Sequence, residues 1–191
     1  MTVQIAQQPD ADALLDRDPL ALLVGMLLDQ QFPMERAFAG PYVLAQRMGV
    51  DHLNAYDMAD YDPEKFATLF VGPPAIHRFP GAMAGRVQGL ARLLVADYDG
   101  RAEAVWEGAK SGAELHARVA TLPGFGQQKA RIFVALLGKQ RGVRPRGWRE
   151  AAGAYGEDGS FRSVADVVSP ESLQKVRDHK KELKAAARAG A

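Results

Sequence analysis

The strongest constraint on the fold is the segment LPGFGQQKARIFVALLGKQ at residues 122–140, where a Pro-Gly-x-Gly turn runs directly into an apolar helix. Gly124 and Gly126 permit positive φ angles and leave no side chain between the backbone and an approaching group. A preceding Ser111-x-x-Glu114 pattern is typical of a capping box that begins a helix. The sequence therefore predicts a helix-hairpin-helix motif at about residues 112–140.

Such a turn is suited to bind a phosphate. The first N–H groups of a helix lack intrahelical partners and lie at the positive end of the helix dipole, so an anion is stabilised there. A glycine turn between two helices is also common in proteins that bind no nucleic acid. The motif alone is therefore equally compatible with a contact to another protein.

Helical signals continue along the whole chain, and strand signals are nearly absent. Asp18 and Pro19 begin an apolar, buried helix, and residues 82–96 form a long amphipathic one. Pro33 and Pro41 are interpreted as the starts of two separate helices, and Asp51 and Asp62 as the starts of two short ones. We expect an all-α fold in a single domain, residues 1–191.

Two further start signals lie near the C-terminus. Ser163-x-x-Asp166 has the capping-box spacing, and Ser169-Pro170 precedes a highly charged segment. They predict a C-terminal helical extension over about residues 163–188. The last helix, strongly charged on one side, could border a basic surface or could fray.

Composition excludes several classes of protein. The 191 residues include no cysteine, so a disulfide, a zinc–thiolate site and a cysteine-bound iron–sulfur cluster are all excluded. No apolar run approaches the roughly 20 residues needed to span a bilayer, and no signal-peptide pattern is present. We expect a cytoplasmic monomer without a membrane partner and without an organic cofactor.

Charge is distributed unevenly although the net charge is only +1. Residues 1–71 carry four Lys or Arg against eleven Asp or Glu, whereas the remainder carries twenty against twelve. A basic cluster follows the hairpin helix and consists of Lys139, Arg141, Arg144, Arg146 and Arg149. It predicts a phosphate-binding surface, for which Arg144 and Arg146 are the candidates, unless these side chains are simply solvated.

The LPGFGQQKA segment at residues 122–130 resembles the hairpin of the HhH-GPD superfamily of base excision DNA glycosylases, which includes endonuclease III and the 3-methyladenine glycosylases. The resemblance covers roughly residues 18–148 and is greatest to a small bacterial branch without an iron–sulfur cluster. It implies an HhH-GPD fold of two closely packed helical lobes that binds double-stranded DNA.

The resemblance also implies binding residues. Gly124, Phe125, Gly126 and Lys129 would contact DNA at the hairpin. Gln31, which follows the apolar helix at LLDQQ, would reach toward the space left by an extruded base, or else would only cap that helix. A monovalent cation, Na⁺ or K⁺, would be held by backbone carbonyls and bridge to a phosphate; the carbonyls are those of Ala120, Leu122 and Phe125.

The catalytic residues of the family are not at their usual positions. The position of the family's aspartate falls on Arg146 or Gly147, and that of its Schiff-base lysine on Gln128. A shift of one residue turns a helical side chain by roughly 100°, so Lys129 is expected to contact phosphate or solvent rather than to replace that lysine. Lyase activity is therefore disfavoured.

Another carboxylate would have to stabilise the oxocarbenium-like transition state of base excision. Asp29 is the candidate, because placing an aspartate at the end of an apolar helix costs free energy unless the carboxylate has a role. It could instead cap the next segment. Glu150 and Asp166 are weaker candidates. The sequence predicts a monofunctional DNA glycosylase, with a non-catalytic DNA-binding protein as the alternative.

A loop at residues 71–81 contains His77, Arg78 and Phe79. An aromatic side chain beside a basic one can stack on a base or bind a phosphate. Burial of Phe79 in the core, with Arg78 in solvent, is the favoured interpretation.

Overall fold

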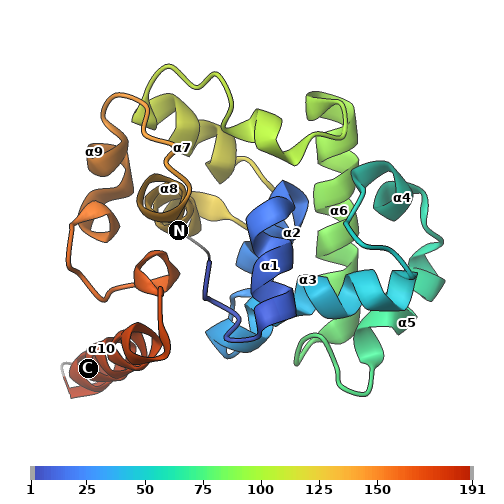
Figure 1. Cartoon of the computed structure of the whole chain (residues 1–191), viewed down its shortest axis with the longest axis horizontal. Helices are drawn as coiled ribbons and strands as arrows, with labels where there is room; N and C mark the ends of the chain where they lie inside the picture. The colour runs from blue at the N-terminus through green and yellow to red at the C-terminus, as the bar shows by residue number, and fades with distance from the viewer. Residues whose placement is uncertain (1–2, 190–191) are drawn as a thin grey trace.

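The computed structural model describes residues 3–189, and every regular element in this part of the chain is helical (Figure 1). The α-helices are α1 Pro9–Arg17, α2 Pro19–Leu28, α3 Met34–Met48, α4 Ala55–Asp60, α5 Pro63–Val71, α6 Pro80–Tyr98, α7 Gly112–Ala120, α8 Gly126–Gln140, α9 Trp148–Ala152 and α10 Pro170–Ala189. Short 3₁₀ helices are η1 Ala102–Val105, η2 Gly153–Gly156 and η3 Val164–Asp166. The expected all-α class is confirmed.

Helix α2 lies in the middle of the molecule (Figure 1). The Asp18 carboxylate accepts hydrogen bonds from the backbone N–H groups of Leu20 and Ala21 at 2.9 and 3.0 Å, as expected of an N-cap. Every residue from 20 to 28 is buried. Gly25 lets α3 approach closely, because a Cβ atom there would lie 2.7 Å from the Phe38 ring.

Helix α3 differs from the prediction. The segments after Pro33 and Pro41 form one helix, with Pro41 inside it, rather than two. A proline in a helix interior removes one backbone hydrogen bond at a cost of about 3 kcal/mol. Here both halves bury apolar side chains, including Phe38 and Leu44, in the core that α3 shares with α1, α2 and α5, and this packing outweighs the local preference.

Helices α4, α5 and α6 pack together beyond α3 (Figure 1). Asp62 caps α5 as expected, since its carboxylate accepts from the Lys65 N–H at 2.9 Å. The expected start at Asp51 is wrong, because α4 begins only after Asn54, whose side chain caps it. Asp51 is exposed, whereas Leu53 is buried and its N–H donates to the Asp18 carboxylate at 2.7 Å, a hydrogen bond that ties this segment to the start of α2.

Helices α7 and α8 form the predicted helix-hairpin-helix, at residues 112–120 and 126–140. Ser111 Oγ accepts from the Glu114 N–H at 3.2 Å, whereas the Glu114 carboxylate accepts from the Lys110 N–H, so the capping box is not reciprocal. Helix α9 packs tightly on both helices. A Cβ atom on Gly138 would lie 2.3 Å from the Trp148 ring.

The C-terminal extension begins as predicted but is interrupted. Ser163 and Asp166 form a reciprocal capping box, yet this box begins only the short η3 helix. Helix α10 starts at Pro170 and contacts the rest of the chain mainly through η3 (Figure 1).

No helix in residues 3–189 combines the length and apolar character required to cross a membrane. The nearest approach to a sheet in the same residues is an isolated bridge between Ser111 and Arg146.

Candidate functional site

The hairpin turn presents backbone rather than side chains. Gly124 and Gly126 have φ angles of 80° and 67°, which strain any residue with a Cβ atom. The Phe125 side chain between them is buried and meets the Phe133 ring edge to face, with centroids 5.8 Å apart. Phe125 can therefore reach DNA only through its main chain.

The carbonyls expected to hold a monovalent cation lie at both ends of this turn. Ala120 ends α7, and the Leu122 carbonyl accepts a hydrogen bond from the Phe125 N–H at 3.1 Å. A carbonyl oxygen has a second lone pair, so this bond leaves Leu122 able to bind an ion. In residues 3–189 no cluster of three or more His, Asp or Glu side chains has the arrangement of a metal site.

Asp29 lies where α2 ends. Its N–H donates to the Gly25 carbonyl at 3.1 Å, but its carboxylate forms no hydrogen bond with any described residue. Burial raises the pKa of this carboxyl, the positive charges of Lys180 and Lys129 oppose that rise, and the negative charge of Glu35 adds to it. Because no backbone N–H of the described residues donates to this carboxylate, the alternative in which Asp29 caps the next segment is wrong.

Lys129 points from the hairpin helix toward the same place. Its Nζ donates to the Leu27 carbonyl at 3.0 Å, so the side chain crosses from α8 to the end of α2. Burial lowers the pKa of the Lys129 amine to about 8; the charge of Asp29 counteracts this and that of Arg86 reinforces it. The lysine is therefore not a solvated one, as the sequence had suggested it could be.

Gln128, the residue at the family's lysine position, faces elsewhere. Its amide donates to the Tyr155 hydroxyl at 3.0 Å, on the side of η2. The one-residue shift thus directs Lys129, and not residue 128, toward Asp29. The Asp29 carboxylate and the Lys129 amine, whose pKa is lowered, therefore lie beside the glycine turn. The turn is close to the end of α2, because a Cβ atom on Gly124 would contact the Leu27 side chain at 3.5 Å.

Gln31 is exposed and has a φ angle of 51°, in the left-handed region that non-glycine residues seldom adopt. The capping role considered for it belongs to Gln30, whose amide donates to the Leu27 carbonyl at 2.8 Å. Arg86 then donates to the Gln30 side-chain oxygen at 2.8 Å. Gln31 is left to project from the end of α2.

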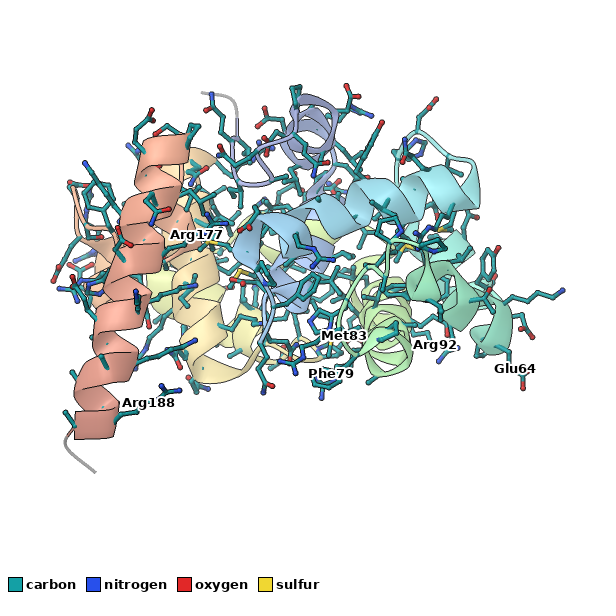
Figure 2. All side chains as sticks on the ribbon, turned by 90° about the horizontal axis from the view of Figure 1, so that it is seen from below. Glu64, Phe79, Met83, Arg92, Arg177 and Arg188 are labelled. Atoms are coloured by element: carbon teal, nitrogen blue, oxygen red, sulfur yellow. The ribbon has the colours of Figure 1, made fainter. Side chains whose placement is uncertain are left out.

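The loop before α6 packs against the segment that follows α2. His77 is fully buried: its Nδ1 accepts from the Phe79 N–H at 3.1 Å, so Nε2 carries the proton and donates to the Gln30 carbonyl, also at 3.1 Å. Phe79, labelled in Figure 2, is 45% exposed. The Arg78 guanidinium lies 4.9 Å from the centroid of its ring. The favoured burial of Phe79 is therefore wrong, because His77 occupies the buried position instead.

Most of the basic cluster after α8 is engaged within the protein. Lys139 pairs with Asp166 at 2.5 Å, Arg141 with Asp16 at 3.1 Å and Arg149 with Asp158 at 2.7 Å. Arg144 Nε donates to the Gly138 carbonyl at 2.8 Å and thereby caps α8. Of the two Arg candidates, this leaves Arg146 with an exposed side chain that forms no hydrogen bond to the described chain.

The family's aspartate position lies apart from Asp29. Arg146 and Gly147 line a hollow of about 650 Å³ on the outer side of α7 and α9, with His116, Arg131 and Glu150. Asp166 is buried in its ion pair with Lys139, so it is a structural residue. Of the carboxylates considered from the sequence, Asp29 is the one beside the hairpin.

No family model, curated protein or solved structure matches this chain at a significant level. The geometry of the site is therefore the basis for its chemistry. Residues that sequence reasoning missed here are Glu35, Arg86 and Lys180. They act on Asp29 and Lys129 through space and come from α3, α6 and α10, so no sequence spacing indicates them.

We predict that Asp29→Asn lowers the pKa of Lys129 below its value of about 8, because the Asp29 charge is what opposes the effect of burial on that amine. The pKa is measured by NMR titration after reductive ¹³C-methylation of the lysines. Lys65, an exposed lysine on α5, provides the internal reference. An unchanged Lys129 titration in the variant would show that the two charges do not interact.

Proposed function

We propose that this protein is a monofunctional DNA glycosylase with an HhH-GPD fold, which acts as a monomer on double-stranded DNA in the cytoplasm. The observation that carries the proposal is the partly buried Asp29 carboxylate, which forms no hydrogen bond within residues 3–189 and lies beside Lys129 and the glycine hairpin. It is supported by Gln31, which is exposed and follows Asp29 by two residues at the end of α2.

Asp29 is suited to base excision by its surroundings. In excision the N-glycosidic bond breaks, the electron pair leaves with the base, and positive charge develops on the sugar. A carboxylate with little access to water stabilises that charge more strongly than a solvated one does. A carboxylate with a raised pKa is also a better general base for the water that attacks C1′.

The chain supplies the remaining groups for binding. The N–H groups of the hairpin contact a phosphate without reading sequence, and Arg146 adds an exposed positive charge. A cation on the hairpin carbonyls would strengthen the same contact. Gln31 fills the space left by the flipped nucleotide, and exposed Phe79 offers a surface for stacking.

The test is release of free base from duplexes that each carry one alkylated, deaminated or oxidised base. We expect release of at least one base and an intact abasic site. Salt-sensitive binding to duplex without release of any base would instead favour the non-catalytic DNA-binding alternative. The absence of both release and binding would leave a helix-hairpin-helix used for protein contact.

Lys129 favours a second candidate, an additional lyase activity. An amine with a pKa of about 8 is partly neutral near physiological pH, and a neutral amine can add to the C1′ aldehyde of an abasic site and lose water to form a Schiff base. Borohydride reduces such an intermediate to a stable adduct. Trapping that requires Lys129 would establish a bifunctional enzyme, whereas release without trapping supports the monofunctional one.

A further inference from the structure

Helix α10 carries a basic stripe along one side. The stripe consists of Arg177, Lys180, Lys181, Lys184 and Arg188. At about 100° per residue, these five positions fall within roughly a third of the helix circumference. The acidic residues Glu171, Asp178 and Glu182 lie together on a different side, so the charges are segregated.

Packing accounts for little of this stripe. Helix α10 buries only Ser172, Leu173 and Val176, all in its first two turns, and every residue from 181 to 189 is exposed. Figure 2 shows the helix along one edge of the molecule, with Arg177 and Arg188 labelled on it. The second half of a 20-residue helix therefore extends into solvent.

The stripe borders a groove whose far wall follows the candidate site in the chain. One wall consists of the five basic residues, and the opposite wall of Phe32, Pro33, Met34 and Glu35, around a volume of about 450 Å³. Arg177 and Glu35 form an ion pair that joins the two walls. The opposite wall directly follows Gln31 in the chain, and Lys180 is close enough to Asp29 to act on its charge.

We propose that the basic stripe of α10 binds the phosphates of duplex DNA that flank the nucleotide held at Asp29. This inference rests on the proposed function and extends it to a segment outside the hairpin. From Arg177 to Arg188 the helix rises about 16 Å, at about 1.5 Å per residue. One DNA strand presents a phosphate about every 3.4 Å along its axis, so the stripe spans about five of them.

An anionic membrane surface fits the same charges less well. A helix that lies on a membrane needs a broad exposed apolar face beside its basic one. Helix α10 has already buried Leu173 and Val176 against the protein, and Leu183 is its one exposed large hydrophobic side chain, at 56% exposure. Binding to DNA phosphates requires basic side chains but no apolar face, so DNA is the better partner.

The test compares two variants that lose the same charge. Lys181→Gln/Lys184→Gln removes two exposed lysines from the stripe, and Lys65→Gln/Lys175→Gln removes two exposed lysines elsewhere, one on α5 and one on the side of α10 that faces Phe161. The affinity of the full chain for an undamaged duplex is measured from about 50 to 200 mM salt. Circular dichroism verifies that both variants remain helical.

We expect the stripe variant to bind on the order of tenfold more weakly near physiological salt, with the slope of log affinity against log salt reduced by about 1.8, since each phosphate contact contributes about 0.9. The control variant should bind as the wild type does. Equal losses in both variants, or no loss in either, would overturn the proposal. So would an unchanged slope together with lost binding to phosphatidylserine vesicles, which would assign the stripe to a membrane.

These outcomes separate this inference from the proposed function. If the wild type releases a base and the stripe variant retains full affinity, only the stripe assignment is wrong. If the wild type neither binds duplex nor releases a base, the proposed function is wrong and this inference is wrong with it.

Discussion

Asp29→Asn should reduce the rate of base release by about 10²- to 10⁴-fold, the range that a positioned acid–base group contributes. Asparagine preserves the shape of the side chain but cannot carry the charge that stabilises the transition state. The rate is measured under single-turnover conditions on a substrate that the wild type cleaves. DNA affinity should remain within a few-fold, since the hairpin is unchanged.

Stability separates a catalytic role for Asp29 from a structural one. A carboxyl with a raised pKa binds more protons in the folded than in the unfolded protein, so its contribution to stability falls as the pH rises above the ordinary aspartate pKa of 3.8. Asp29→Asn removes that penalty but also removes the charge that compensates the burial of the Lys129 amine, so we expect little net change in the free energy of unfolding at neutral pH. Loss of rate together with loss of folding would contradict the catalytic role.

Asp60→Asn is the matched control for this experiment. Asp60 is exposed on α4, away from the hairpin, and its replacement changes the net charge by the same amount. Its rate of base release should equal that of the wild type. If Asp29→Asn also retains the full rate, the carboxylate that performs excision must be another one, and the site proposed here is wrong.

Lys139→Met should lower the free energy of unfolding by about 3–5 kcal/mol, the usual effect of removing one member of a buried ion pair. Asp166 is nearly inaccessible, and its Oδ1 accepts from Lys139 Nζ at 2.5 Å. The same ammonium also donates to the Glu157 carbonyl at 2.6 Å and to Ser160 Oγ at 3.2 Å. Methionine fills a similar volume but leaves all three acceptors without this donor.

The measurement is denaturant unfolding at neutral pH, with Arg146→Met as the control. Arg146 is exposed and its side chain forms no hydrogen bond within residues 3–189, so its replacement should change stability by no more than about 0.5 kcal/mol. The Lys139→Met/Asp166→Asn double variant should regain part of the loss, because it no longer buries an unpaired charge. Equal stability of the two single variants would show that the ion pair contributes nothing.

These two residues illustrate how far sequence reasoning extends. Lys139 and Arg146 belong to one run of basic residues, and nothing in that run distinguishes them. Lys139 is structural because the chain returns to place Asp166 beside it, 27 residues later. Composition identifies a cluster of charge, but only the fold decides which charges remain available to a partner.

Local signals predicted the helices well. Asp18, Asp62 and Ser111 cap α2, α5 and α7, and the hairpin lies where its glycines predict it. Such signals succeed because a cap or a turn depends on atoms a few residues apart. They failed at Pro41, where burial of both halves of α3 in the core outweighs the loss of one backbone hydrogen bond.

The sequence by itself determined an all-α chain with a glycine hairpin between two helices, since helix periodicity, caps and turns are local properties. Only the tertiary structure decided which side chains meet at that hairpin. It directed Lys129 rather than Gln128 toward Asp29, buried His77 and exposed Phe79. The physical reason is that burial and through-space charge, which shift the pKa values of Asp29 and Lys129, arise from elements far apart in the chain.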